Sequence, residues 1–166
     1  MATIKAASPH FRFSAAHFIF FDDGTCEPLH GHDYRVVVEL TGRLSSAGLL
    51  FDFLLLEGIV REILRPLDHR VLVPRDSSGV HVLERDGEVE LLAAGKRRCL
   101  PREDCCFLPV PNTTAENLVA YLGETVRTAL QRAGDFPHAR VDGLRVELFE
   151  SDAYSAVWVG DFGNAG

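Results

Sequence analysis

The chain has 166 residues, of which 46% are hydrophobic and 25% charged, which is the composition of one globular domain with a sizeable core. Its formal net charge of −7 argues against nucleic acid or an anionic membrane as a main partner, but not against a small anion in a locally basic or metal-containing pocket. No apolar run could span a bilayer and MATIKAASPHFRF has no signal-peptide core, so we expect a cytoplasmic protein.

Two strands are predicted near the start of the chain, because apolar and polar side chains alternate there. In the first, over residues 11–17, one face carries Phe11, Phe13, Ala15 and His17. The breaker sequence FFDDGT follows as a turn or loop. In the second strand, over about residues 32–41, one face carries Tyr34, Val36, Val38 and Leu40.

Two helices are predicted next, the first of them amphipathic. The first begins after Asp52 as N-cap and ends at Pro66. Its apolar stripe has helical spacing and consists of Leu56, Ile59, Val60, Ile63, Leu64 and Leu67. The second helix opens in TTAENL, where Thr113 and Glu116 have the spacing of a capping box, and stops at Gly134.

Two further strands close the chain, one with Leu144, Val146 and Leu148 on a single face and one in AYSAVWVG. An insertion over residues 74–109 separates the helices, and within it VHVLERDGEVELL predicts a hairpin with Asp86-Gly87 at the turn. The element order predicts one α+β domain over residues 1–166, with an antiparallel sheet and both helices on one face.

The cysteines do not indicate a structural metal site or a disulfide framework. Cys26, Cys99, Cys105 and Cys106 form no CxxC pair, and a reducing compartment disfavours disulfides. We interpret Cys99, Cys105 and Cys106 as ordinary core or strand positions.

The most reactive stretch of the sequence lies at the entrance of the second strand. His30 and His32 are two residues apart, so both imidazoles project to one side of an extended chain. If the first two strands pair, His17 completes an open three-histidine zinc site of the catalytic kind. Cys26 and Glu27 add a nucleophile and a base just upstream. The alternative is a set of ordinary strand-end histidines.

The residues alone leave the roles of two other polar positions undecided. Asp68-His69 is either a functional pair or a helix C-terminal histidine beside a solvated aspartate. Glu150 shares a predicted strand face with apolar residues, so it either emerges into solvent or binds a cationic or amide-rich ligand.

Six motifs in order carry a resemblance to a known family: FSAAH from Phe13, CEPLHGHDY from Cys26, FDF from Phe51, LDHRVL from Leu67, TTAENL from Thr113 and VELFESDAY from Val146. Together they resemble the 6-pyruvoyltetrahydropterin synthase / 6-carboxytetrahydropterin synthase family over nearly all the chain except the insertion. The resemblance implies the tunnelling fold, with a four-stranded antiparallel sheet and two helices, and a homohexamer made of two trimers. It also implies a Zn²⁺ cofactor and a pterin triphosphate as the small-molecule substrate.

The resemblance also assigns roles to individual residues. It gives the zinc ligands as His17, His30 and His32. It gives the catalytic groups as the thiol of Cys26 and the acid/base pair Asp68 and His69. It gives the pterin-binding groups as Glu150, which anchors the ring, and the helix-start residues Thr114 and Glu116.

The identity of the product depends on two adjacent residues. Cys26 precedes His30 by the spacing found in the 6-carboxytetrahydropterin synthases of queuosine biosynthesis. Glu27-x-x-His30 resembles a branch in which glutamate replaces the cysteine and 6-hydroxymethyl-dihydropterin is formed. The resemblance therefore implies a zinc-dependent lyase that converts 7,8-dihydroneopterin triphosphate into 6-carboxy-5,6,7,8-tetrahydropterin. The alternatives are a 6-pyruvoyl or 6-hydroxymethyl product, an aldolase-like or cyclohydrolase-like activity, and a non-catalytic pterin- or zinc-binding module.

Cys26 and Glu27 are neighbours, so in an extended loop their side chains point apart. Pro28 restricts Glu27 to extended geometry. We therefore expect Cys26 to be the main base, and Glu27 to act in the hydroxymethyl-forming reaction or to be a surface carboxylate.

Overall fold

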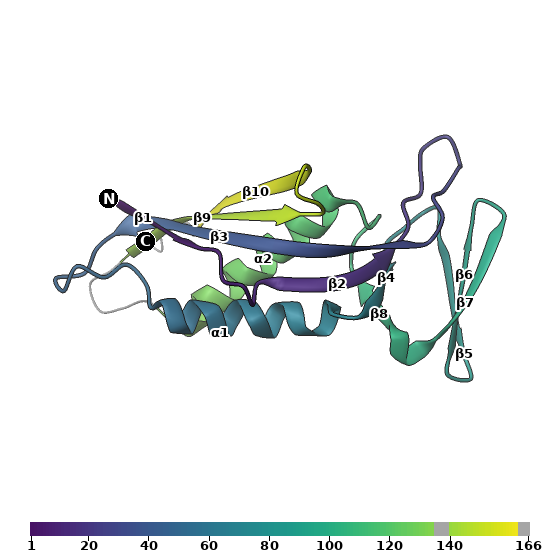
Figure 1. Ribbon diagram of the computed structural model, residues 1–166, viewed down its shortest axis with the longest axis horizontal. Helices are drawn as coiled ribbons and strands as arrows, with labels where there is room; N and C mark the ends of the chain where they lie inside the picture. The colour runs from purple at the N-terminus through teal and green to yellow at the C-terminus, as the bar shows by residue number, and fades with distance from the viewer. Residues whose placement is uncertain (135–139, 163–166) are drawn as a thin grey trace.

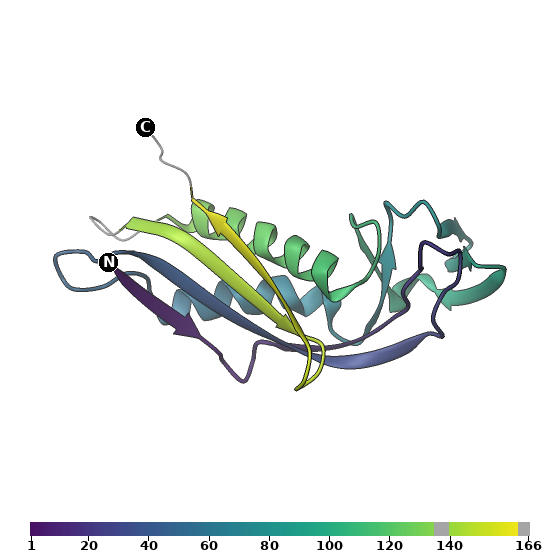
Figure 2. The same cartoon turned by 90° about the horizontal axis from the view of Figure 1, so that it is seen from above.

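The structure is a computed structural model that describes residues 1–134 and 140–162. Its main sheet has seven strands, in the order β10-β9-β3-β2-β4-β8, with β1 paired to β3. The strands are β1 (Ala2–Ala6), β2 (Arg12–His17), β3 (His30–Arg43), β4 (Arg70–Pro74), β8 (Cys105–Leu108), β9 (Arg140–Phe149) and β10 (Ser155–Asp161). Figures 1 and 2 show the two helices lying along one face of this sheet.

The predicted four-stranded antiparallel sheet is therefore wrong in strand number and in direction, although the α+β class is confirmed. β3 is 14 residues long, and β1 and β2 pair end to end along the same edge of it. After helix α1 the chain crosses over and returns as β4, which runs parallel to β2, and β8 then pairs parallel to β4.

The helices begin and end close to the predicted positions. α1 (Phe53–Leu64) is capped by the side chain of Asp52, which accepts from the backbone N–H groups of Leu54 and Leu55. Pro66 lies in the short 3₁₀ turn η1 (Arg65–Leu67) that ends the helix. Among the described residues, no helix is both long and apolar enough to cross a membrane.

The start of α2 (Ala115–Ala133) corrects the predicted capping box. The N-cap is Thr114, whose hydroxyl accepts from the backbone N–H of Asn117. Thr113 is fully buried, and its hydroxyl donates to the carbonyl of Phe18. The helix starts one residue later than the pattern indicated because tertiary contacts with the end of β2 hold Thr113 outside it.

The predicted apolar faces form the main core between the sheet and the helices. Buried residues of β3 and β9 pack there against those of α1 and α2. They include Tyr34, Val36, Val38, Leu40, Leu144, Val146, Leu148, Leu56, Val60, Leu118, Leu122 and Val126. The alternation in the strands and the helical spacing in α1 therefore identified their share of this core correctly, whereas the buried face of α2 was not predicted.

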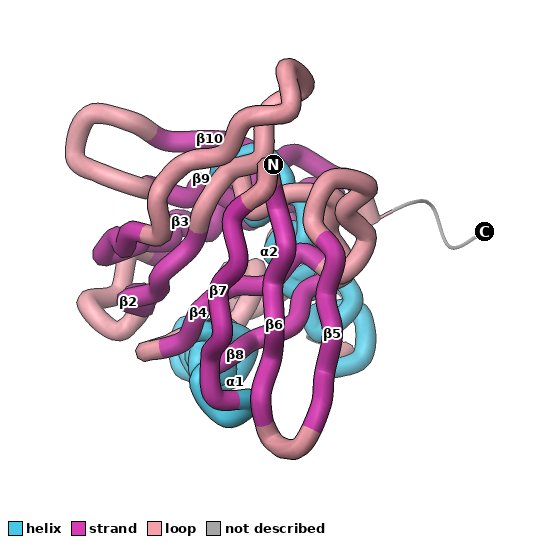
Figure 3. The backbone as a smooth tube through the Cα atoms, turned by 90° about the vertical axis from the view of Figure 1, so that its right-hand side faces the viewer, coloured by secondary structure: helices cyan, strands magenta, loops and turns pink. Residues whose placement is uncertain are grey.

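The insertion between the helices forms a separate three-stranded sheet, seen face-on in Figure 3. Its strands are β5 (His81–Arg85), β6 (Glu88–Ala93) and β7 (Lys96–Pro101), and β5–β6 is the predicted hairpin with its turn at Asp86-Gly87. The 3₁₀ turn η2 (Arg102–Asp104) leads into β8, which lies inside the predicted insertion but belongs to the main sheet. A second core joins the insertion to the body: Phe18, Cys26, Val73, Val80, Val89, Leu91, Ala93 and Cys105.

The cysteines occupy the ordinary positions predicted for them. Cys99 lies on β7, and Cys105 and Cys106 lie on β8. All four are free thiols.

The contact between α2 and β10 makes a testable stability prediction. A Cβ on Gly123 would overlap with the indole of Trp158, so the indole would have to move. We expect Gly123→Ala to lower the free energy of unfolding by about 1–3 kcal/mol. The matched control is Gly58→Ala on α1, where a Cβ meets nothing within 4 Å and a gain of about 0.5–1 kcal/mol is expected. Urea denaturation measures both, and equal stability of the two variants would contradict the packing.

Candidate active site

Three histidines meet where β2 ends and β3 begins. His17 is the cross-strand partner of His30, and Ala15 is the partner of His32, so all three imidazoles lie on one face. Their ligand atoms lie within 4.8 Å of one another. The predicted pairing of the first two strands is therefore confirmed, and it brings His17, His30 and His32 together as a cluster that can hold a metal ion.

Hydrogen bonds orient two of the rings for ligation. Nδ1 of His17 donates to the carbonyl of Thr113 at 2.8 Å, and Nδ1 of His30 donates to the carbonyl of Pro28 at 2.9 Å. Protons on both Nδ1 atoms leave the Nε2 lone pairs available, which is how zinc-binding histidines are commonly held.

The buried histidine is the clearest sign that the cluster fits a metal. His17 is 0% exposed, and its Nε2 is a buried nitrogen with no hydrogen-bond partner among the described residues. Burial lowers the pKa of His17, which favours the neutral, ligating form. An open three-imidazole site is the ligand set of catalytic zinc. The role of Thr113 in orienting His17 was not visible in the sequence, because the contact joins residues 96 positions apart.

Of the two adjacent candidate bases, the structure places Glu27 beside the cluster. Oε2 of Glu27 lies 3.9 Å from Nε2 of His30 and is buried with no hydrogen-bond partner among the described residues. Cys26 is 8% exposed and packs into the second core, where its thiol contacts the carbonyl of Ala93 at 3.8 Å. The two side chains therefore diverge as expected, and the carboxylate is the group beside the histidines.

Glu150 connects the cluster to a pocket. Its Oε1 lies 3.5 Å from Nε2 of His17 and 3.7 Å from Nε2 of His32. The same oxygen accepts a hydrogen bond from the hydroxyl of Tyr34 at 3.4 Å. Burial raises the pKa of Tyr34 and the nearby carboxylate raises it further, so the hydroxyl remains a donor.

The three residues predicted to bind substrate line one pocket of about 530 Å³: Thr114, Glu116 and Glu150. Phe20, Asn112 and Tyr154 also line it and were not identified from the sequence. The side chain of Asn112 bonds both backbone groups of Phe20, donating to its carbonyl at 2.7 Å and accepting from its N–H at 3.3 Å. The pocket wall is therefore fixed by a long-range contact that no local pattern reveals.

Asp68 and His69 form the predicted pair. Oδ1 of Asp68 lies 3.0 Å from Nδ1 of His69 and accepts from the backbone N–H of Ser14 at 2.8 Å. The hydrogen bond from Ser14 is the main cause of the lowered pKa of Asp68, and His69 adds to it. His69 has φ of 57°, and its N–H donates to the carbonyl of Ser14 at 2.7 Å. Such a conformation in a residue other than glycine is costly and is often found at functional positions.

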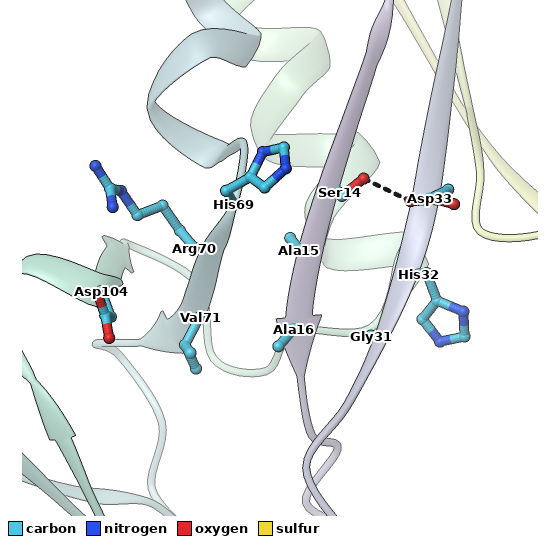
Figure 4. A pocket seen from close by; sticks show the side chains of 10 residues that line it. All are labelled: Ser14, Ala15, Ala16, Gly31, His32, Asp33, His69, Arg70, Val71 and Asp104. Carbon is cyan, nitrogen blue, oxygen red and sulfur yellow. Dashed lines mark hydrogen bonds between the residues drawn. The ribbon is translucent and has the colours of Figure 1, made fainter.

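The structure does not bring this pair into the pocket that contains Thr114, Glu116 and Glu150. His69 has 81% of its side chain exposed and lines a different pocket of about 550 Å³, with Ser14, Asp33, Arg70 and Asp104 among its other residues. His32 also borders this second pocket, but Figure 4 shows His32 and His69 on opposite sides of β2 and β3. Within one chain, His69 therefore does not face the histidine cluster.

A mixed sheet with helices on one face, a cluster of imidazoles that can hold a metal ion and a neighbouring carboxylate-lined pocket are features of an enzyme that acts on a small molecule. The chain belongs to the 6-pyruvoyl tetrahydropterin synthase family, whose model matches residues 7–160. The resemblance seen in the sequence is thereby confirmed.

Two curated relatives and one solved structure illustrate this membership. A putative 6-carboxy-5,6,7,8-tetrahydropterin synthase of Methanocaldococcus jannaschii is 36% identical over 159 residues, which are 95% of this chain and 95% of the relative. The 6-carboxy-5,6,7,8-tetrahydropterin synthase of Haemophilus influenzae is 31% identical over 121 residues, covering 69% of this chain and 77% of that protein. The 6-pyruvoyl tetrahydropterin synthase of Plasmodium vivax has a TM-score of 0.87 at 26% identity, covering 96% of this chain and 98% of that one.

The protein is therefore an enzyme, as predicted, and the non-catalytic binding module is not supported. Enzymes of this family act on a pterin substrate. Two of the similar Plasmodium vivax structures are variants in which a glutamate, described as a catalytic residue of that enzyme, is replaced by alanine or by cysteine.

Proposed function

We propose that the protein is a zinc-dependent lyase that converts 7,8-dihydroneopterin triphosphate into 6-carboxy-5,6,7,8-tetrahydropterin, in queuosine biosynthesis in the cytoplasm. The observation that carries the proposal is the buried Nε2 of His17, which has no hydrogen-bond partner among the described residues and is directed into a three-imidazole cluster beside Glu27 and Glu150. The product is supported by the curated relatives, which have 6-carboxytetrahydropterin synthase names.

Different residues of the site would have different roles in the reaction. His17, His30 and His32 would hold the zinc ion, which supplies Lewis-acid chemistry to the hydroxyl-bearing side chain of the substrate. The carboxylate of Glu27, beside His30, would remove a proton from that side chain as general base. Glu150 would accept hydrogen bonds from the amino and ring N–H groups of the pterin, which orients the substrate for proton transfer. Thr114 and Glu116 line the same pocket and complete the contact with the ring.

A second product is favoured by one observation. The glutamate motif resembles the branch that forms 6-hydroxymethyl-dihydropterin, and Glu27 is the candidate base that lies beside the cluster. Formation of 6-hydroxymethyl-dihydropterin by the same site is therefore the alternative function.

The product assay decides between these functions. We expect the zinc-loaded enzyme to consume 7,8-dihydroneopterin triphosphate and release 6-carboxytetrahydropterin, identified by liquid chromatography and mass spectrometry. A hydroxymethyl product alone would establish the alternative, and an unchanged substrate would contradict both. Enzyme treated with a chelator serves as the control, since removal of the ion should stop turnover.

We also propose that the enzyme is a homohexamer of two trimers in which Asp68 and His69 act on the pocket of a neighbouring subunit. Val157 and Val159 are 45% and 68% exposed on the edge strand β10, and exposed strand edges are commonly covered by pairing. His69 is exposed and outside the pocket of its own chain, so an acid/base role there requires a second subunit.

Subunit mixing tests this arrangement. We expect Glu27→Ala and His69→Ala each to be nearly inactive alone, and equal mixtures refolded together to regain roughly one quarter of wild-type activity, because a quarter of random subunit pairs combine both intact residues. The control mixes Glu27→Ala with Glu27→Ala/His69→Ala, which offers no intact Glu27. Light scattering verifies the assembly, and mixed hexamers without regained activity would contradict a shared site.

A further inference from the structure

Two basic side chains of the insertion reach the loop that carries Glu27. On β7, Nζ of Lys96 donates to the carbonyl of Cys26 at 3.2 Å, and Nη2 of Arg98 donates to the carbonyl of Glu27 at 2.9 Å. Residues two apart on a strand point to the same side, so both face the loop. Arg97 lies between them and pairs instead with Glu90 on β6 at 2.6 Å.

Arg98 also contacts two nearby side chains. Its Nη2 lies 3.5 Å from the thiol of Cys26, and its guanidinium lies 4.1 Å from the ring centroid of Phe18. Phe18 is fully buried and directly follows His17. Since a guanidinium is planar and holds several contacts in a fixed geometry, Arg98 links the insertion both to the end of β2 and to the loop.

Hydrogen bonds hold both backbone groups of Glu27. The N–H of Glu27 donates to the carbonyl of Ile19 at 2.9 Å, and its carbonyl accepts from Arg98. Pro28 follows and restricts the conformation of Glu27. The carboxylate that lies 3.9 Å from His30 is therefore carried by a backbone whose carbonyl is held by the insertion.

We propose that Arg98 is a positioning residue, through which the β5–β7 sheet holds Glu27 in its place beside His30. The insertion then contributes to the geometry of the active site as well as to the fold. This inference rests on the proposed role of Glu27 as general base. Arg98 does not line the pocket that contains Glu150, so it acts on the position of the base and not on binding of the pterin ring.

The first test measures the effects of a substitution on kcat and on KM separately. We expect Arg98→Met to lower kcat by about 10- to 100-fold, because a base displaced by about 1 Å transfers protons poorly. KM for 7,8-dihydroneopterin triphosphate should change by less than about threefold, and metal content should stay at the wild-type level. The matched control is Arg97→Met, which should keep wild-type kcat. Wild-type kcat in folded Arg98→Met enzyme would overturn the proposal.

The conservative variant covers the case in which Arg98→Met does not fold. In Arg98→Lys, an ammonium can still donate to the carbonyl of Glu27 but cannot keep the planar contacts. We expect kcat between those of Arg98→Met and the wild type, with unchanged metal content. A wild-type kcat in Arg98→Lys together with an unfolded Arg98→Met would assign Arg98 a structural role and overturn the proposal.

A double-mutant cycle shows whether Arg98 acts through Glu27. In the Glu27→Ala background, Arg98→Met should lower the residual rate no further, measured with enzyme in excess of substrate. A loss of the same size in both backgrounds would mean a general structural effect and would overturn the proposal. If Glu27→Ala alone keeps wild-type activity, the assignment of the base fails together with the inference. If Glu27→Ala is inactive and Arg98→Met is not, only the inference fails.

Discussion

Replacing Glu27 with glutamine is expected to lower kcat by roughly 10³-fold, whereas replacing Cys26 with alanine should lower it by less than about tenfold, given that a positioned general base contributes about 10²- to 10⁴-fold. The physical reason is the position of each side chain relative to the histidine cluster. Oε2 of Glu27 lies 3.9 Å from Nε2 of His30, while the thiol of Cys26 is enclosed by the second core and lies next to Ala93 and Arg98. Glutamine keeps the size of the side chain but has neither its basicity nor its negative charge.

The measurement is the steady-state rate of both variants with 7,8-dihydroneopterin triphosphate, together with identification of the products. Urea denaturation of Cys26→Ala provides the control, because removing a buried thiol costs some stability without touching the cluster. The opposite outcome, with Cys26→Ala inactive and Glu27→Gln active, would confirm the expectation drawn from the sequence that Cys26 is the main base. It would mean that the loop rearranges when substrate binds.

Loss of either outer histidine is expected to remove the metal and with it the activity. In His30→Ala and His32→Ala, one of three ligands is missing. Zinc affinity should then fall by more than the roughly 10- to 100-fold seen when only an outer-shell partner of a ligand is lost. His17 is less suited to this test, because it is fully buried and bonded to Thr113, so its removal also disturbs the core.

Elemental analysis after dialysis measures the zinc bound per chain, and we expect about one in the wild type and far less in both variants. The matched control is His81→Ala, because His81 lies exposed on β5, in the insertion, and is not part of the cluster. Full zinc content in His30→Ala and in His32→Ala would show that the ion is held elsewhere.

The sequence by itself determined the elements whose signal is local. Alternation identified the apolar faces of β2, β3 and β9, helical spacing identified α1, the residues at its two ends identified α2, and Asp86-Gly87 identified the hairpin turn. The spacing of His30 and His32 placed both rings on one side of β3, because a strand repeats every two residues. The ordered motifs indicated the family, which the family comparison confirmed.

Only the tertiary structure decided which strands pair and what each loop side chain contacts. β1, β4 and β8 join the main sheet through partners far away in the chain, so their membership is not visible in any local pattern. Local sequence patterns do not show whether Cys26 or Glu27 faces the histidines, because alternation indicates only that their side chains point apart. Apolar residues of the insertion sheet enclose Cys26, and the guanidinium of Arg98 holds the carbonyl of Glu27. The carboxylate therefore lies beside the histidines because of contacts with residues more than 60 positions away in the chain.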